Sequence, residues 1–136
     1  MKVMMVLICV ISILYASEST FIEIDLAKNK IMVYKDGDLI ISGKALGGRK
    51  GYKSPLGEFK IYKKEKKHIS SKFPKPNGGA KMPYSMFLKK GNRMLGVALH
   101  VGSLKKKSHG CIHLSWKVAK YLYNNFPLNT EVWIHK

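Results

Sequence analysis

Apolar and polar residues alternate along most of the chain that follows residue 20, which is the pattern of β-strands that bury one face. The segment 21–26, for example, reads Phe-Ile-Glu-Ile-Asp-Leu. An Asp-Gly pair at residues 36 and 37 separates the second and third segments, and this dipeptide is a strong signal for a tight hairpin. The pattern predicts strands at residues 21–26, 30–35, 39–42, 58–62, 84–89, 94–101 and 130–135.

A different period begins after Ser115, where apolar residues recur at the three- and four-residue spacing of a helix. Ser115 is a suitable N-cap, and Pro127 lies just beyond the segment, where it would end a helix. The apolar positions are Trp116, Val118, Ala119, Leu122 and Tyr123. Because no internal repeat is visible, the pattern predicts one β-rich domain with a capping helix near the C-terminus.

The segment 63–81 interrupts these patterns. It contains Lys63, Lys64, Lys66 and Lys67, followed by prolines and glycines, and it has few apolar residues. We expect a mobile basic loop, which either closes over a site as a lid or serves only as a solvated connector.

Residues 1–17 have the layout of a secretory signal peptide. Lys2 precedes an apolar run that extends to about Ala16, and this run is short for a membrane span. Cleavage near Ala16 or Ser17 would leave a domain of residues 18–136, exported to the periplasm or cell envelope and in contact with the membrane only transiently. The alternative is a short membrane anchor that stays attached.

The charge of the chain narrows the choice of partner. The 136 residues are enough for one domain, and they carry a formal net charge of +17. Such an excess attracts polyanions, including nucleic acids, anionic membranes and acidic polymers. Of the basic residues, 23 are lysine and 2 are arginine. The scarcity of arginine argues against sequence-specific recognition of nucleic acid, because the guanidinium is the usual partner of guanine edges.

Removal of residues 1–17 would leave Cys111 as the one cysteine of the chain, which excludes a disulfide within it. Pairing between two chains stays open, but a reactive thiol is favoured because three histidines lie close in sequence, at positions 100, 109 and 113.

Three kinds of chemistry fit this group of residues. In the first, an imidazole takes the proton of Cys111 and activates it for acyl transfer, while Gly110 leaves room for a substrate carbonyl and for N–H groups that stabilise an oxyanion. In the second, His109, Cys111 and His113 bind a metal with His100 as fourth ligand. In the third, the histidines are structural and the thiol is inert.

A family resemblance favours the first. His100 and Gly102, followed by Ser-His-Gly-Cys-Ile at 108–112 and Leu114, resemble the active-site signature of the L,D-transpeptidase catalytic domain, also called the YkuD family. Further segments resemble the same family in the same order, at residues 21–37, 54–59, 82–87 and 130–134. The resemblance implies a mainly β fold of mixed β-sandwich or barrel-like form with one capping helix, and it implies no metal or other cofactor.

The resemblance also implies roles for the catalytic residues. Cys111 would be the nucleophile, and His100 would be the general base, oriented by a backbone carbonyl just after it at Val101 or Gly102. His109 would shape the site and help to form the oxyanion hole with Gly110 and Cys111.

The resemblance also implies roles for residues that surround the catalytic ones. Ser108 would support the turn that holds the cysteine. Tyr84 would line the substrate groove, although an aromatic residue at that position fits the core equally well. The family usually has arginine two residues after the cysteine, where this chain has His113. If that arginine steers a substrate carboxylate, His113 would do so only weakly unless protonated.

A run of lysines at 105–107 lies in the loop before the cysteine. It is either a solvated charge run or an attractor of acidic peptides.

The resemblance implies a peptidoglycan L,D-transpeptidase. The thiolate would attack the bond between the L-centre of the third stem-peptide residue and D-alanine, and the thioester would pass to an amine of another stem or of a lipoprotein lysine. Alternatives are an L,D-carboxypeptidase that trims tetrapeptide stems, a cationic wall-binding module without catalysis, and a secreted nucleic-acid-binding protein.

Overall fold

The computed structural model describes residues 19–75 and 78–136, with the backbone alone for residues 72–75. The expected signal peptide at 1–17 lies outside the described residues. Among the described residues, no helix is long and apolar enough to cross a membrane.

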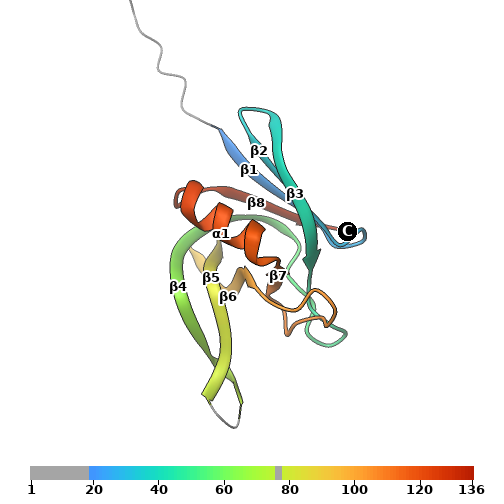
Figure 1. Ribbon diagram of the computed structural model, residues 1–136, viewed down its shortest axis with the longest axis vertical. Coiled ribbons are helices and arrows are strands. Elements are labelled where there is room, and N and C mark those ends of the chain that lie inside the picture. The colour runs from blue at the N-terminus through green and yellow to red at the C-terminus, as the bar shows by residue number, and fades with distance from the viewer. Residues whose placement is uncertain (1–18, 76–77) are drawn as a thin grey trace, which may run out of the picture.

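Eight strands close into a barrel within the described part of the chain (Figure 1). The strands are β1 (Thr20–Asp25), β2 (Lys30–Lys35), β3 (Asp38–Leu46), β4 (Gly57–Lys75), β5 (Gly78–Lys90), β6 (Arg93–Val101), β7 (Ile112–Leu114) and β8 (Glu131–His135). Their order around the barrel is β1-β2-β3-β7-β6-β5-β4-β8. Because β1 pairs with β8 and β6 with β7 in parallel, the sheet is mixed, and the mainly β, barrel-like fold is confirmed.

Strand alternation divides the residues between the core and the outer surface. On β1 and β8, Ile22 pairs with Val132 and Ile24 with Ile134, and all four side chains are fully buried. The residues between them face outward, as the sequence pattern predicts. The turn at residues 36 and 37 has φ angles of 51° and 83°, which is the conformation that an Asp-Gly hairpin requires.

Helix α1 (Trp116–Asn125) packs against β3, β5 and β6, and Figure 1 shows it lying across the barrel. The predicted N-cap is confirmed, since Ser115 Oγ accepts a hydrogen bond of 3.2 Å from the Val118 N–H. The C-terminal end is held by Lys64 of β4, whose Nζ donates to the carbonyls of Tyr123 and Phe126 at 2.8 Å each. Lys64 therefore joins the C-terminal end of the helix to the barrel.

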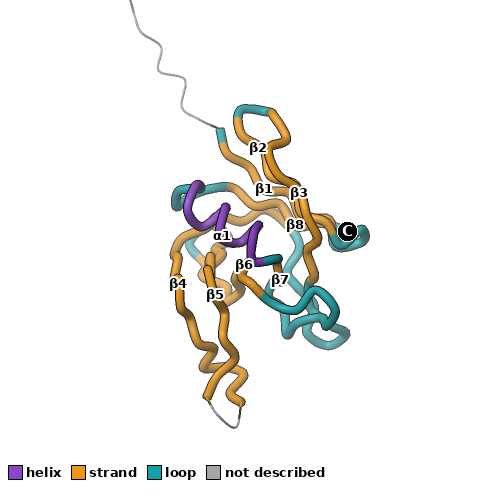
Figure 2. The backbone as a smooth tube through the Cα atoms, viewed as in Figure 1, coloured by secondary structure: helices purple, strands orange, loops and turns teal. Residues whose placement is uncertain are grey.

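The expected loop at 63–81 is wrong, because β4 and β5 form a long hairpin over most of this segment. The paired strands extend beyond the barrel as an arm (Figures 1 and 2). The register shifts between Ile61 and Lys63 and between Ile69 and Pro74, so the ladder accommodates prolines and glycines that usually end a strand. The apolar–polar alternation is weak in this segment because lysine side chains cover apolar surface. Lys63 Nζ, for example, lies 4.5 Å from the centre of the Phe87 ring.

Candidate active site

Two parallel strands bring His100 and Cys111 to one face of the barrel wall. In the β6–β7 register, Leu99 pairs with Ile112 and His100 with His113. Leu99 and Ile112 are fully buried in the core, so the alternate residues His100 and His113 lie on the opposite face of these strands. Cys111 directly precedes β7 and packs against a cluster that includes Ala98, the β6 residue on the same face as His100.

His100 is a buried base with a defined orientation. It is 5% exposed, and its Nδ1 donates a hydrogen bond of 2.7 Å to the Val101 carbonyl, which is one of the two carbonyls expected to orient it. Because a carbonyl only accepts, Nδ1 carries the proton and the Nε2 lone pair is left to accept another.

The charge state of His100 follows from its surroundings. Burial lowers the pKa of His100 from 6.5 to about 4, an effect that the Val101 hydrogen bond partly offsets and that His113 and His68 reinforce. The ring is therefore neutral at pH 7.

His113 supports the His100 ring. Its Nδ1 donates to the Ser103 carbonyl at 2.9 Å, and its ring meets His100 edge-on with centroids 4.9 Å apart. A Cβ atom on Gly102 would lie 2.4 Å from His113 Cδ2, so position 102 must be glycine for this packing. His113 is thus held by Ser103 and by the His100 ring, and its weak steering of a substrate carboxylate stays a prediction.

Hydrogen bonds within the 108–111 turn fix the backbone around Cys111. Ser108 Oγ donates to the Cys111 carbonyl and accepts from the Gly110 N–H at 3.0 Å, which is the supporting role expected for Ser108. Gly110 has a φ of 123°, a conformation that side chains rarely adopt. Its N–H donates to Ser108 Oγ inside the turn, and the part of Gly110 in an oxyanion hole stays a prediction.

The loop between β3 and β4 clamps this turn from the side. Ser54, which is 7% exposed, donates from Oγ to the Gly110 carbonyl at 2.7 Å and accepts from the Gly48 N–H at 2.9 Å. The Arg49 N–H donates to the Ser108 carbonyl at 2.9 Å. Figure 2 shows the loops after β3 and β6 side by side, to the right of the β4–β5 hairpin. Two segments more than fifty residues apart in sequence therefore build one turn.

His109 points toward this second loop. Its Nε2 lies 3.0 Å from Arg49 Nη2, and its ring meets the Tyr52 ring edge-on at 4.9 Å. The guanidinium also lies 5.1 Å from the centre of the Tyr52 ring. Since a guanidinium only donates, His109 Nε2 accepts this hydrogen bond. The structure thus adds Arg49 and Tyr52 to the residues expected around the cysteine.

The β4–β5 hairpin forms another wall of the site. Cys111 is half-buried and packs against the cluster of Met82, Phe87 and Ala98. Beyond Phe87 lies His68, whose ring meets the Phe87 ring edge-on at 4.9 Å. His68 Nδ1 is hydrogen-bonded to the Glu65 carboxylate. The sequence pattern does not reveal this pair, because its residues lie in the segment expected to be a loop.

Tyr84 lies in the hydrophobic core, 6% exposed, instead of along an open groove. Its ring meets Trp116 and Tyr123 edge-on at 5.5 and 5.3 Å, so it locks α1 against β5. Of its two expected places, the core is the one observed.

The side chains considered for a metal site do not converge. His109 is directed to Arg49 and His113 to the Ser103 carbonyl. Within residues 19–75 and 78–136, no three His, Cys, Asp or Glu side chains are grouped to hold an ion.

Comparison with known folds places these features in context. No curated protein matches the chain. An L,D-transpeptidase from Stackebrandtia nassauensis is 25% identical with a TM-score of 0.72, over 89% of this chain and 57% of its own. One from Mycobacterium smegmatis is 20% identical, with a TM-score of 0.74 over 88% and 59%. L,D-transpeptidase 3 of Mycobacterium tuberculosis, with a faropenem-derived adduct, is 21% identical, with a TM-score of 0.72 over 88% and 61%.

The chain spans only about three fifths of the length of these structural relatives. The similarity of these structures to this chain supports the fold, which is a barrel with one helix in the described part. The family itself is shown by the sequence, because the model of the L,D-transpeptidase catalytic domain matches residues 19–134. This protein therefore belongs to the L,D-transpeptidase catalytic domain family.

Proposed function

We propose that the chain is a peptidoglycan L,D-transpeptidase in which Cys111 is the nucleophile and His100 the general base. The proposal rests on the protonation state and the orientation of the His100 ring. Its ring is buried, its pKa is lowered to about 4, and Nδ1 is fixed on the Val101 carbonyl. A neutral imidazole with an Nε2 lone pair, on the same strand face as a half-buried thiol, can accept the thiol proton. The negative charge of the thiolate formed beside it would offset the burial that disfavours the imidazolium.

In the first half-reaction, the Cys111 proton passes to His100 Nε2 while sulfur attacks the carbonyl at the L-centre of the third stem residue. The tetrahedral anion collapses, and the bond from that carbonyl carbon to the D-alanine nitrogen breaks. The imidazolium returns the proton to the leaving amine, so D-alanine departs neutral at nitrogen and a thioester remains on Cys111. Because burial disfavours the imidazolium, the ring gives up this proton readily.

In the second half-reaction, the free amine of another stem peptide attacks the thioester carbonyl. His100 takes a proton from that amine and returns it to the departing sulfur, so an amide forms and the thiol is restored. Attack by water gives a trimmed tripeptide carboxylate instead, which is the L,D-carboxypeptidase reaction. A lipoprotein lysine is a further acceptor of the same chemistry.

Positive charge beside the site would attract the carboxylates of stem peptides. Arg49 is exposed and hydrogen-bonded to His109, two residues before the nucleophile. Because His113 is committed to Ser103 and His100, Arg49 is the better candidate for the cation that the family usually places two residues after the cysteine.

We further propose that the protein is exported, with residues 1–17 as its signal peptide. The support is the Lys-then-apolar layout of that segment and the net charge of +17, which suits a protein held near an anionic cell wall.

The proposal is tested by incubating the protein without residues 1–17 with disaccharide-tetrapeptide and separating the products. Cross-linked dimer with released D-alanine supports transpeptidation, and tripeptide alone supports the carboxypeptidase alternative. Both should be lost in Cys111→Ala and in His100→Gln. If the wild type is folded and forms neither product, the wall-binding module without catalysis replaces the enzyme.

A further inference from the structure

Across the barrel from the catalytic face, a tryptophan occupies the outer surface of three adjacent strands. In the registers of β1, β8 and β4, Trp133 stands beside Glu23 on one side and Glu58 on the other. In the barrel order, β8 is four strands from β7 in either direction, so this surface is opposite the strand that follows Cys111.

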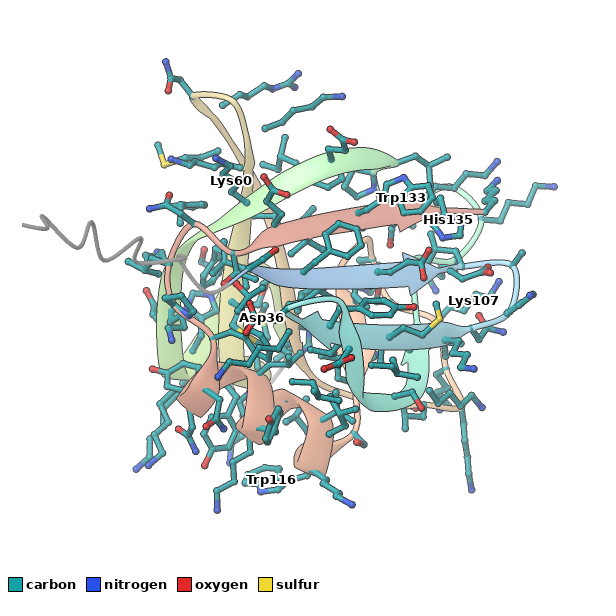
Figure 3. The ribbon with its side chains drawn as sticks, turned by 90° about the horizontal axis from the view of Figure 1, so that it is seen from above. Asp36, Lys60, Lys107, Trp116, Trp133 and His135 are labelled. Carbon is teal, nitrogen blue, oxygen red and sulfur yellow. The ribbon has the colours of Figure 1, made fainter. Side chains whose placement is uncertain are left out.

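A cavity of about 440 Å³ opens beside Trp133. Residues of five segments line it, among them Phe21, Glu58, Lys60, Asn129, Glu131 and Trp133. Figure 3 shows Trp133 and Lys60 on the neighbouring strands β8 and β4. The cavity thus combines aromatic surface with carboxylate, amide and ammonium groups.

Contacts on one side hold the indole of Trp133 in place. The His135 ring lies 4.1 Å from it at an interplanar angle of 32°, and His135 Nε2 is 3.3 Å from Glu23 Oε1. Trp133 is nevertheless 38% exposed. A large aromatic surface that is fixed before binding loses little side-chain entropy when a ligand covers it.

The charge around this tryptophan differs from that of the rest of the molecule. Glu23, Glu58 and Glu131 are three of the eight acidic residues in a chain of net charge +17. Lys60 and Lys89 line the same cavity as Glu58 and Glu131, so the charges there are balanced, and the carboxylates are good acceptors for hydroxyl groups.

We propose that this cavity binds the pyranose rings of an uncharged oligosaccharide, with one ring stacked on Trp133. The axial hydrogens of a pyranose carry slight positive charge and pack well on the negative face of an indole. The sugar hydroxyls would donate to Glu58 and Glu131 and accept from Asn129 and Lys60. The site goes beyond the proposed reaction and needs no turnover at Cys111.

The chain has two tryptophans, which gives the test an internal control. The indole N–H signals of ¹⁵N-labelled protein are followed during titration with chitotetraose. The Trp133 signal is expected to shift saturably, while the signal of Trp116, which is 55% exposed on α1, stays in place. Trp133→Ala should weaken binding by about fivefold or more, and Trp116→Ala should leave it unchanged.

Several results would overturn the proposal. They are the absence of a Trp133 shift in a folded protein, equal shifts of both indoles, and binding that survives Trp133→Ala. A Trp133 shift that follows protein concentration without sugar would assign the cavity to an interface between copies. Because the readout is binding, loss of activity in Cys111→Ala leaves it intact, and the two proposals can fail separately.

Discussion

The pH dependence of Cys111 reactivity should follow the protonation of His100. Lowering the pH is the perturbation, because a proton on Nε2 removes the base. Burial lowers the pKa of this ring from 6.5 to about 4. With a pKa of about 4, about 90% of the His100 rings would be neutral at pH 5. With the ordinary pKa of 6.5, about 3% would be neutral. The fraction of protein with a neutral base at pH 5 therefore differs by about thirtyfold between the two cases.

The assay is the rate of alkylation of Cys111 by iodoacetamide, measured by intact mass between about pH 3 and 8. This reagent has no group that titrates in the range, so the acid limb belongs to the protein. We expect the acid limb to have its midpoint near pH 4. His113→Leu removes a neighbouring charge that lowers the pKa of His100, so its midpoint should move toward higher pH.

Unfolding must be followed in parallel, because His100 also links stability to pH. Between pH 6.5 and about 4 the unfolded chain binds the proton that the folded chain excludes, so the free energy of unfolding falls as the pH is lowered through this window. Circular dichroism at each pH identifies the range in which the rates report folded protein. An acid limb near pH 6.5 in folded protein would refute the account of His100 as a desolvated base.

Three substitutions test the packing around the site. In Gly102→Ala the new Cβ would lie 2.4 Å from the His113 ring, so the rate of acylation of Cys111 should fall by about tenfold or more. Adding His113→Ala to the same chain should restore part of that rate. Ser54→Ala removes hydrogen bonds to Gly110 and Gly48 and should cost about 1–3 kcal/mol of unfolding free energy in urea titrations, while Ser54→Thr, which keeps the hydroxyl, should cost less; equal losses would contradict the clamp. Tyr84→Ala should cost about 3–5 kcal/mol by the same measurement, as expected of a core residue, and a near-neutral effect would place the ring outside the core.

Much of the fold follows from local patterns in the sequence. The alternation in 21–26 and 130–135 matches β1 and β8 because one face of each strand meets the core. The helix followed from its period and from the Ser115 cap. The β4–β5 hairpin did not, because its long lysine side chains cover apolar surface and so remove the contrast on which the pattern depends.

The candidate site likewise contains residues that the sequence identifies and residues that it does not. Cys111 and His100 are close in sequence and belong to a recognisable motif, so both could be selected from the sequence. Arg49 and Ser54 act on the 108–111 turn through contacts across more than fifty residues, which a single sequence does not reveal. The Ser-Pro-Leu-Gly segment at 54–57 was a signal for family membership, but nothing in it indicated a hydrogen bond to Gly110.

The most direct test of the central claim is intact-mass spectrometry after incubation with a carbapenem, followed by peptide mapping. A carbapenem carries an electrophilic amide that an activated thiol can open, so it probes the proposed nucleophile directly. We expect one adduct per chain, located on Cys111, absent in Cys111→Ala and formed much more slowly in His100→Gln. A folded wild-type protein that forms no adduct, or an adduct that persists in Cys111→Ala, would contradict it.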